Sequence, residues 1–170
     1  MVQKFRNRGF TLVELLTVVL IMGILAAIAV PNFVAAKKNS QNSHVRSNMH
    51  TTQIAAEGYS TDTGGNYGDA SAIRPYYPGG QMQVSGSAGT RPRNPVSGAF
   101  DEPTLTGGPT TSAAINLLRA ATPASFGTPG RHSYDQAEGT SSYSIVGCDC
   151  GVNSVQITGN AGKVLVMSNQ

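Results

Sequence analysis

Residues 9–36 read GFTLVELLTVVLIMGILAAIAVPNFVAA, an apolar run interrupted by a single charged side chain, Glu14. At about 1.5 Å rise per residue, an α-helix of this length exceeds the roughly 30 Å hydrocarbon core of a bilayer. Apolar residues cover every side of such a helix, so it must be surrounded by lipid or by other apolar helices. The stretch predicts a helix that can span a membrane, with Gly23 and Pro31 as its weak points.

A short basic segment, residues 1–9, precedes this run. Lys4, Arg6 and Arg8 account for the formal net charge of +3, because the other nine of the 12 basic residues balance nine acidic ones. The rest of the chain has no basic excess that would indicate a dedicated nucleic-acid site. A length of 170 residues suffices for one small globular domain with an appendage.

The helical pattern continues beyond the apolar run, over residues 37–63, but becomes amphipathic. Apolar and small side chains recur there at spacings of three and four, at Val45, Met49, Thr52, Ala56 and Tyr59. One side of this half-helix should therefore pack on a domain. Gly64 and Gly65 supply the left-handed cap that ends the helix near Thr63.

The remaining residues, 64–170, predict a globular head. Residues 66–110 are rich in Gly, Pro, Ser and Thr and indicate a long, exposed surface loop, whereas residues 111–121 indicate a short helix. Residues 140–168 change to a period of two, which predicts three short antiparallel strands. The expected strands are Tyr143–Val146, Val152–Thr158 and Lys163–Met167. The predicted class is α+β, with the amphipathic half-helix covering the small sheet.

Glu14 is the informative side chain of the apolar run. An ionised group inside a membrane costs about 2.5 to 3.5 kcal/mol even on lenient scales, so it needs a partner. No cation lies nearby in the apolar run, but cleavage after Gly9 would give Phe10 an α-amino group about one helical turn away. In a bundle of staggered identical helices, the Glu14 carboxylate of one copy can meet the Phe10 ammonium of the next.

The stretch Gly9-Phe10-Thr11-Leu12-Val13-Glu14 resembles the class III signal of type IV prepilins and type II secretion pseudopilins. The similarity continues through Pro31 and covers about the first 36 residues. It implies cleavage after Gly9 by a prepilin peptidase and N-methylation of Phe10. It also implies a pilin fold, a long helix packed by its C-terminal half on a small antiparallel sheet, and a helix that loosens at Gly23 and Pro31.

The resemblance further implies a structural role without a cofactor. The precursor would lie in the inner membrane with its leader in the cytoplasm and its head outside, and then join a homo-oligomeric helical filament. The implied partners are the peptidase, a membrane platform, a cytoplasmic ATPase and, in a two-membrane cell, a secretin. The filament would be a surface pilus for adhesion, motility or DNA uptake; the alternative is a periplasmic pseudopilus of a type II secretion system.

Three other interpretations of the N-terminus remain. An ordinary secretory signal peptide would be cut near residues 27–29 or 34–36, where small residues gather. Glu14 within the apolar run and the helical pattern past Lys37 count against it. A plain membrane anchor, or a tethered binding module that never polymerises, would have the same apolar helix but no need of Glu14.

The histidines and catalytic motifs give no indication of an enzyme. His44 and His50 lie on different faces of the predicted helix, and His132 lies in a Gly/Pro-rich loop, so all three are expected to be solvated. The sequence holds no H-E-x-x-H, G-x-S-x-G or phosphate-binding loop.

Two further groups of residues suggest a metal or redox site only weakly. Cys148 and Cys150 are too close to close a stabilising loop and too few for a four-ligand metal site, so a hairpin turn is expected. Asp62, Asn66 and Asp69 carry oxygen ligands, but their spacing fits no standard calcium loop, and a polar turn is expected.

Overall fold

A computed structural model describes residues 9–78, 90–100, 109–124, 127–137, 140–151, 156–159 and 162–169. Internal contacts divide the chain into two units, Met1–Lys37 and Lys38–Gln170, and each is described by itself. Lys4, Arg6 and Arg8 of the predicted leader lie outside the described residues.

Helix α1, Leu12–Asp62, is 51 residues long and belongs to both units. It continues through Gly23 and Pro31, although Pro31 has no N–H to donate to the preceding turn. It ends where Gly64 and Gly65 adopt positive φ values of 73° and 97°, a conformation that costs glycine little. Among the described residues it is the one helix long and apolar enough to cross a membrane.

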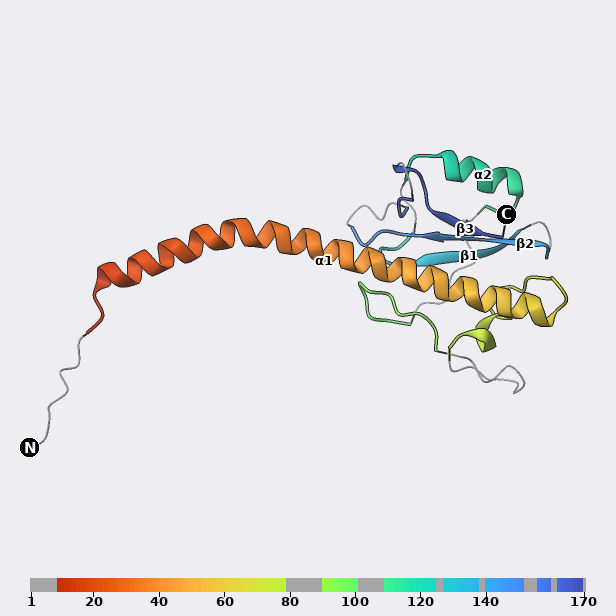
Figure 1. Cartoon of the computed structure of the whole chain (residues 1–170), viewed down its shortest axis with the longest axis horizontal. Helices are drawn as coiled ribbons and strands as arrows, with labels where there is room; N and C mark the ends of the chain where they lie inside the picture. Colours follow the sequence, from red (N-terminus) through yellow and green to blue (C-terminus); the bar gives the residue numbers. More distant parts are fainter. Residues whose placement is uncertain are drawn as a thin grey trace, which may run out of the picture. The chain divides into compact units, whose positions relative to one another are not determined.

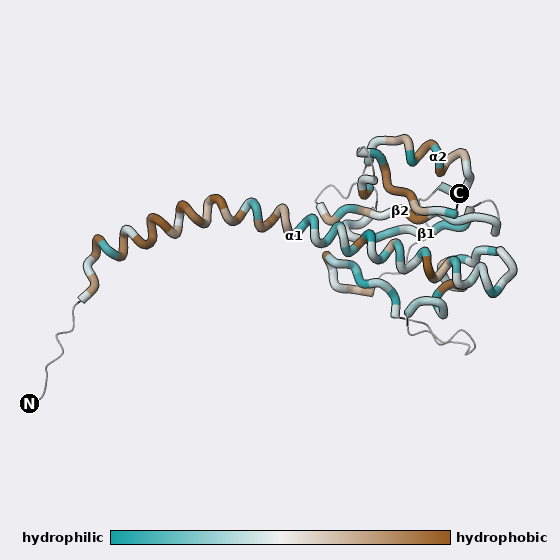
Figure 2. The backbone as a smooth tube through the Cα atoms, viewed as in Figure 1, coloured by the Kyte–Doolittle hydropathy of each residue, from teal (hydrophilic) through white to brown (hydrophobic). Residues whose placement is uncertain are grey.

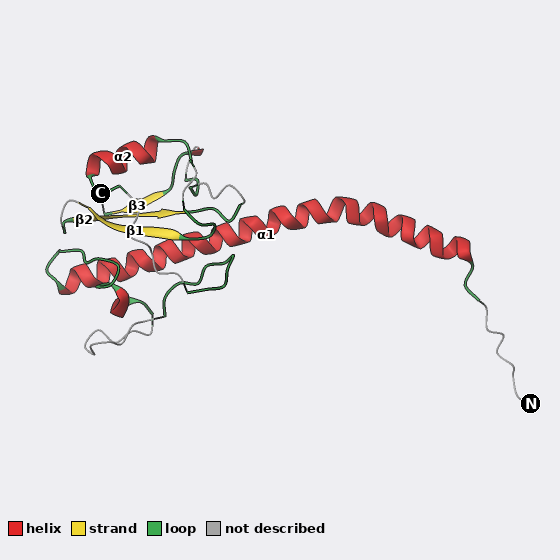
Figure 3. Cartoon of the chain, turned by 180° about the vertical axis from the view of Figure 1, so that it is seen from behind, coloured by secondary structure: helices red, strands yellow, loops and turns green. Residues whose placement is uncertain are grey.

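The second unit is built on a three-stranded antiparallel sheet, in the order β1 (His132–Ala137), β2 (Ser142–Gly147), β3 (Val166–Ser168). The head half of α1 lies along one face of the sheet, and helix α2 (Ser112–Ala120) lies on the other (Figures 1 and 3). These elements confirm the predicted α+β pilin fold of a long N-terminal helix and a small antiparallel sheet.

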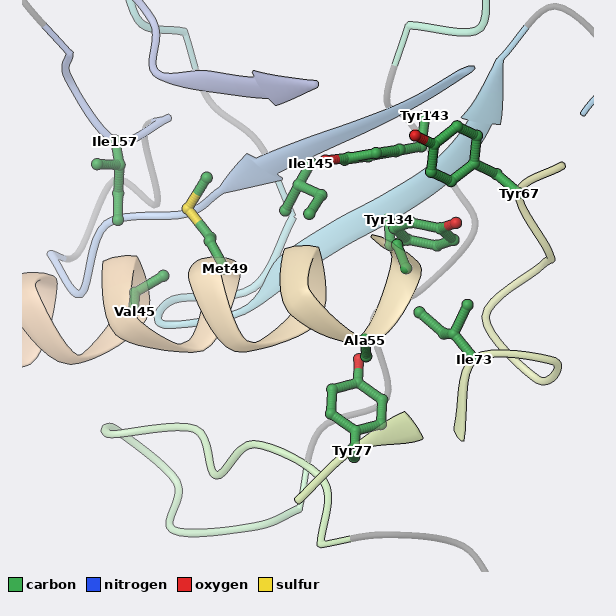
Figure 4. Packing of buried hydrophobic residues seen from close by; sticks show 11 residues of the cluster. Val45, Met49, Ala55, Tyr67, Ile73, Tyr77, Tyr134, Tyr143, Ile145 and Ile157 are labelled. Carbon is green, nitrogen blue, oxygen red and sulfur yellow. The ribbon is translucent and has the colours of Figure 1, made fainter. Parts of the chain in front are cut away.

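The main core lies between α1 and the sheet. Val45 and Met49 of α1 face Ile145 of β2, and all three side chains are fully buried (Figure 4). Tyr143 stacks on Tyr134 with ring centroids 5.8 Å apart and meets Tyr67 edge-on at 4.8 Å. The apolar stripe predicted on the amphipathic half of the helix therefore packs on the sheet as expected.

A second, smaller core lies under α2. It consists of buried residues from α2, β2 and the C-terminal segment, namely Ile115, Val146, Val164 and Val166. Ile145 of β2 belongs to the main core and Val146 to the smaller one. Every residue of β2 is buried. The central strand is therefore covered on both faces.

The positions of the strands differ from the prediction. β1 lies before residues 140–168, where all three strands were expected, and it contains His132, which is buried and not solvated. Its sequence, HSYDQA, does not alternate between apolar and polar residues. His132 and Tyr134 are nevertheless buried, because their polar atoms form hydrogen bonds with Thr52 and with the Gly68 carbonyl. Gln156 and Thr158 of the expected middle strand form only isolated bridges, while residues 152–155 lie outside the described part.

The predicted surface loop, residues 66–110, also packs more deeply than expected. Ile73 and Tyr77 are buried against the main core, and Arg74–Tyr76 form a short 3-10 helix between them. The interpretation of this whole stretch as exposed was wrong for these residues, since isolated large side chains carry no period that would reveal burial. Residues 79–89 and 101–108 of the loop lie outside the described part.

Gly147 marks the closest approach of the sheet to α1. A Cβ atom there would lie 2.5 Å from Met49 Sδ and 3.2 Å from Val45 Cγ1. We expect Gly147→Val to lower the free energy of unfolding of the head by about 1 to 3 kcal/mol through overpacking. Denaturant titration in micelles, followed by tyrosine circular dichroism, measures this loss. In the Met49→Ala background the same change should cost clearly less; equal costs in both backgrounds would contradict the proposed clash.

Candidate assembly site

Helix α1 begins with a reciprocal pair of side-chain contacts between Thr11 and Glu14. Glu14 Oε2 accepts hydrogen bonds from the Thr11 backbone N–H at 2.9 Å and from the Thr11 hydroxyl at 2.7 Å. In return, the Glu14 N–H donates to Thr11 Oγ1 at 3.3 Å. This arrangement is a capping box, which satisfies donors that a helix otherwise leaves unpaired at its N-terminus.

The capping box changes the interpretation of Glu14. Sequence reasoning treated this carboxylate as lacking any local partner, and the pattern Thr11-x-x-Glu14, which could have revealed one, was missed. One carboxylate oxygen is occupied by Thr11, but no described residue donates a hydrogen bond to the other, Oε1. Glu14 can therefore cap its own helix and still offer one oxygen to a cation.

Gly9 and Phe10 precede the helix. Neither has helical structure, and both are exposed, Phe10 to 75%. The first helical hydrogen bond runs from the Leu15 N–H to the Thr11 carbonyl, so the peptide bond between Gly9 and Phe10 lies outside the helix. A Cβ added at Gly9 would meet nothing within 4 Å, so this chain does not itself require glycine there.

The first unit leaves its apolar side chains uncovered. The large hydrophobic residues from Phe10 to Val34 are between 44% and 79% exposed. Figure 2 shows hydrophobic residues along this part of α1, in contrast to the mixed colouring of its head half. No described residue of this chain covers them, so their surroundings must be lipid or other copies of the helix.

A polar collar holds α1 to the loops at the beginning of the second unit. Its members are Lys38, Gln41, Asn42, Arg46 and Asn48. Lys38 Nζ lies 2.9 Å from Asp149 Oδ2, and Asn42 Oδ1 accepts a hydrogen bond from the Cys150 N–H at 2.8 Å. The collar thereby joins α1 to segments far away in the sequence, including residues 149–150 and Thr158.

The two cysteines form no disulfide. Cys148 is buried and Cys150 is half-buried. Burial, with a smaller contribution from the negative charge of Asp149, raises the pKa of each thiol to about 11. The thiols are therefore protonated near neutral pH, which does not favour redox chemistry or metal binding.

The three candidate calcium ligands each have partners of their own. Asp62 accepts from the Tyr76 hydroxyl at 2.9 Å, and Asn66 Oδ1 accepts from the Thr140 hydroxyl at 2.9 Å. Asp69 caps a turn through Ser71, whose hydroxyl donates to it at 2.6 Å. Within the described ranges, no group of three or more His, Cys, Asp or Glu side chains could hold a metal.

The histidines divide into two classes. His44 and His50 are exposed as predicted, and His50 Nδ1 lies 3.2 Å from Gln53 Oε1. His132 Nε2 instead lies 2.8 Å from the buried Thr52 hydroxyl, which also contacts the Tyr77 hydroxyl at 3.0 Å. Burial lowers the pKa of His132 to about 4, so the ring is neutral inside the head. This contact links β1 to α1.

Comparison with known proteins finds similarity at the N-terminus. The sequence model of the prokaryotic N-terminal methylation motif matches residues 4–30. The type IV major pilin protein PilA of Myxococcus xanthus is 48% identical over 54 residues, which are 32% of this chain and 24% of that protein. The type II secretion system core protein G of Klebsiella pneumoniae is 37% identical over 57 residues, covering 34% and 41% of the two chains.

A third relative, the type IV wide pilus major component PilA4 of Thermus thermophilus, is 40% identical over 55 residues, 32% of this chain and 42% of its own length. The matched segments thus span less than half of each of these relatives. No solved structure matches the chain significantly. In this N-terminal segment the chain is therefore similar to type IV pilins and to the type II secretion system core protein G.

Proposed function

We propose that this chain is the subunit of a helical filament, assembled through the apolar half of α1. The observation that carries the proposal is the uncovered helix that begins at Leu12 with one half-satisfied carboxylate, Glu14. Pilins and pseudopilins are structural subunits and not enzymes, and relatives of both kinds share this segment. No reaction by the chain is needed.

Processing would prepare the subunit for assembly. A prepilin peptidase cuts after Gly9, which removes Lys4, Arg6 and Arg8 and leaves an α-amino group on Phe10. N-methylation of Phe10 keeps that amine positively charged. The ammonium of one subunit then binds Glu14 Oε1 of its neighbour, while Thr11 keeps the other oxygen. Pairing of the two charges in the apolar bundle would fix the register of the subunits.

The route to the filament follows from the same features. The precursor is held in the inner membrane by residues 10–36, with its leader in the cytoplasm and residues 64–170 outside. A membrane platform and a cytoplasmic ATPase extract it, and a secretin lets the filament pass a second membrane where there is one. Loosening of α1 at Gly23 and Pro31 would let the helices adapt to the filament.

The relatives include both pilins and a secretion pseudopilin, so two destinations are compared. We favour a surface pilus that serves adhesion, motility or DNA uptake, because the long segment of residues 66–110 suits an exposed face. Filaments sheared from the cell surface should then contain the chain. A secretion defect on deletion, without surface filaments, would favour the pseudopilus.

Cleavage gives a direct test. N-terminal sequencing of the mature chain should begin at Phe10, and not near Val30 or Lys37 as for an ordinary signal peptide. We expect Gly9→Leu to abolish cleavage and filament formation, because the larger side chain obstructs the peptidase.

The matched control for this test is Gly23→Leu, since a Cβ at either glycine meets nothing within 4 Å. The control should be cleaved like the wild type. Normal cleavage of Gly9→Leu, measured by mass spectrometry of membrane extracts, would contradict the proposed processing site.

A further inference from the structure

The second unit has two ends of opposite charge along α1. We call the end where α1 enters the unit, at Lys38, the proximal end, and the end where α1 stops, at Asp62, the distal end. The rise of an α-helix puts them about 36 Å apart. Both ends belong to the same unit.

The proximal end is basic. Lys38, Arg46 and Lys163 are all exposed there. An Arg46 guanidinium N–H donates to the Thr158 carbonyl at 2.7 Å. Thr158 forms an isolated bridge with Val164, and the Gly159 N–H donates to the Lys163 carbonyl at 2.7 Å. The carboxylate of Asp149 partly offsets this charge through its ion pair with Lys38, but Arg46 and Lys163 remain as an excess.

The distal end is acidic. Glu57, Asp62 and Asp69 are exposed there, and Arg74 is the nearby cation whose charge acts on Asp69. The last turn of α1 contains no basic residue, and it ends on Asp62. The C-terminus of a helix carries partial negative charge, so an aspartate there is unfavourable to the helix itself. Asp62 accepts a hydrogen bond from the Tyr76 hydroxyl at 2.9 Å, but its side chain stays exposed, so its charge can also meet a cationic partner.

We propose that the acidic distal end of one copy binds the basic proximal end of the next copy along the filament. The contact joins two different surfaces of the same chain, a heterologous arrangement that repeats without closing and so suits a helical polymer. Such exposed charges orient neighbouring subunits and weaken with salt. This inference rests on the proposed function, and it adds a contact between heads to the contact between apolar helices.

Charge reversal of full-length chains expressed in cells tests the contact. Asp62→Lys and Lys163→Glu should each reduce sheared filaments at least about fivefold at physiological salt, because attraction becomes repulsion. The double variant Asp62→Lys/Lys163→Glu should recover part of the loss. Tyr76→Phe controls for the hydrogen bond that Asp62 accepts, and Asn116→Lys adds a charge on exposed α2; both should assemble normally.

The outcomes separate this inference from the proposed function. Wild-type yields in both single reversals, with filaments lost in Glu14→Ala, would overturn the contact and leave the filament proposal standing. A loss in Lys163→Glu alone would also overturn it, since the basic end would then serve another anion, such as lipid headgroups. No filaments containing the wild-type chain would contradict the proposed function itself.

Discussion

Glu14→Ala should remove filaments almost completely while leaving membrane insertion and cleavage after Gly9 intact. The substitution takes away the only carboxylate of the apolar half-helix and leaves the Phe10 ammonium of the neighbouring subunit without a partner. Removing one partner of a buried ion pair costs about 3 to 5 kcal/mol. This cost recurs at every subunit contact of the polymer. Quantifying sheared filaments per cell, with the amount of processed chain in the membrane, measures the effect.

Glu14→Gln separates the charge of Glu14 from its capping role, and Thr11→Ser is the conservative control. Glu14→Gln retains an oxygen that can accept from Thr11 but carries no charge, so it should fail to assemble. Thr11→Ser retains the hydroxyl that donates to Glu14 Oε2 and should assemble normally. Filaments from Glu14→Gln at wild-type yield would rule out charge pairing as the reason for this residue. If the wild-type chain were monomeric in membrane extracts and none of the three substitutions altered this state, a tethered binding module would be favoured.

The parts of the fold that the sequence predicts are those with a repeating pattern. The apolar run and the stripe of Val45, Met49, Thr52 and Ala56 specify the helix and its buried side, because burial on one side must follow the helical period. Gly64 and Gly65 mark its end for a local steric reason. The structure has the helix, its buried stripe and its end at the predicted positions.

The parts that the sequence does not predict depend on tertiary partners. β1 appears as a polar loop because His132 and Tyr134 satisfy their polar atoms across the core, with Thr52 and the Gly68 carbonyl. Ile73 and Tyr77 are single anchors in a segment without period. At the candidate site the reverse holds: Thr11 is three residues from Glu14, so the capping box is a local pattern that the sequence itself contains.

The buried His132 should make the stability of the head depend on pH. Its pKa is lowered from the usual 6.5 to about 4, chiefly by burial and then by the nearby charge of Arg131. The folded state therefore binds this proton less readily than the unfolded state. The stabilising contribution is complete above pH 6.5 and is lost as the pH falls toward 4, by about 3 kcal/mol in all.

Denaturant titrations of the full chain in micelles at pH 7, 5.5 and 4.5 measure this dependence. Tyrosine circular dichroism follows the head alone, because all six tyrosines lie beyond Lys38 and the chain has no tryptophan. His132→Gln replaces the titrating ring by a neutral amide, so the variant should lose less stability on acidification than the wild type. The exposed His50→Gln is the matched control and should keep the wild-type slope. The carboxylates titrate equally in all three chains. Parallel slopes for the wild type and His132→Gln would therefore show that the proton is accepted elsewhere. The contact between His132 and Thr52 would then not limit the stability of the head in acid.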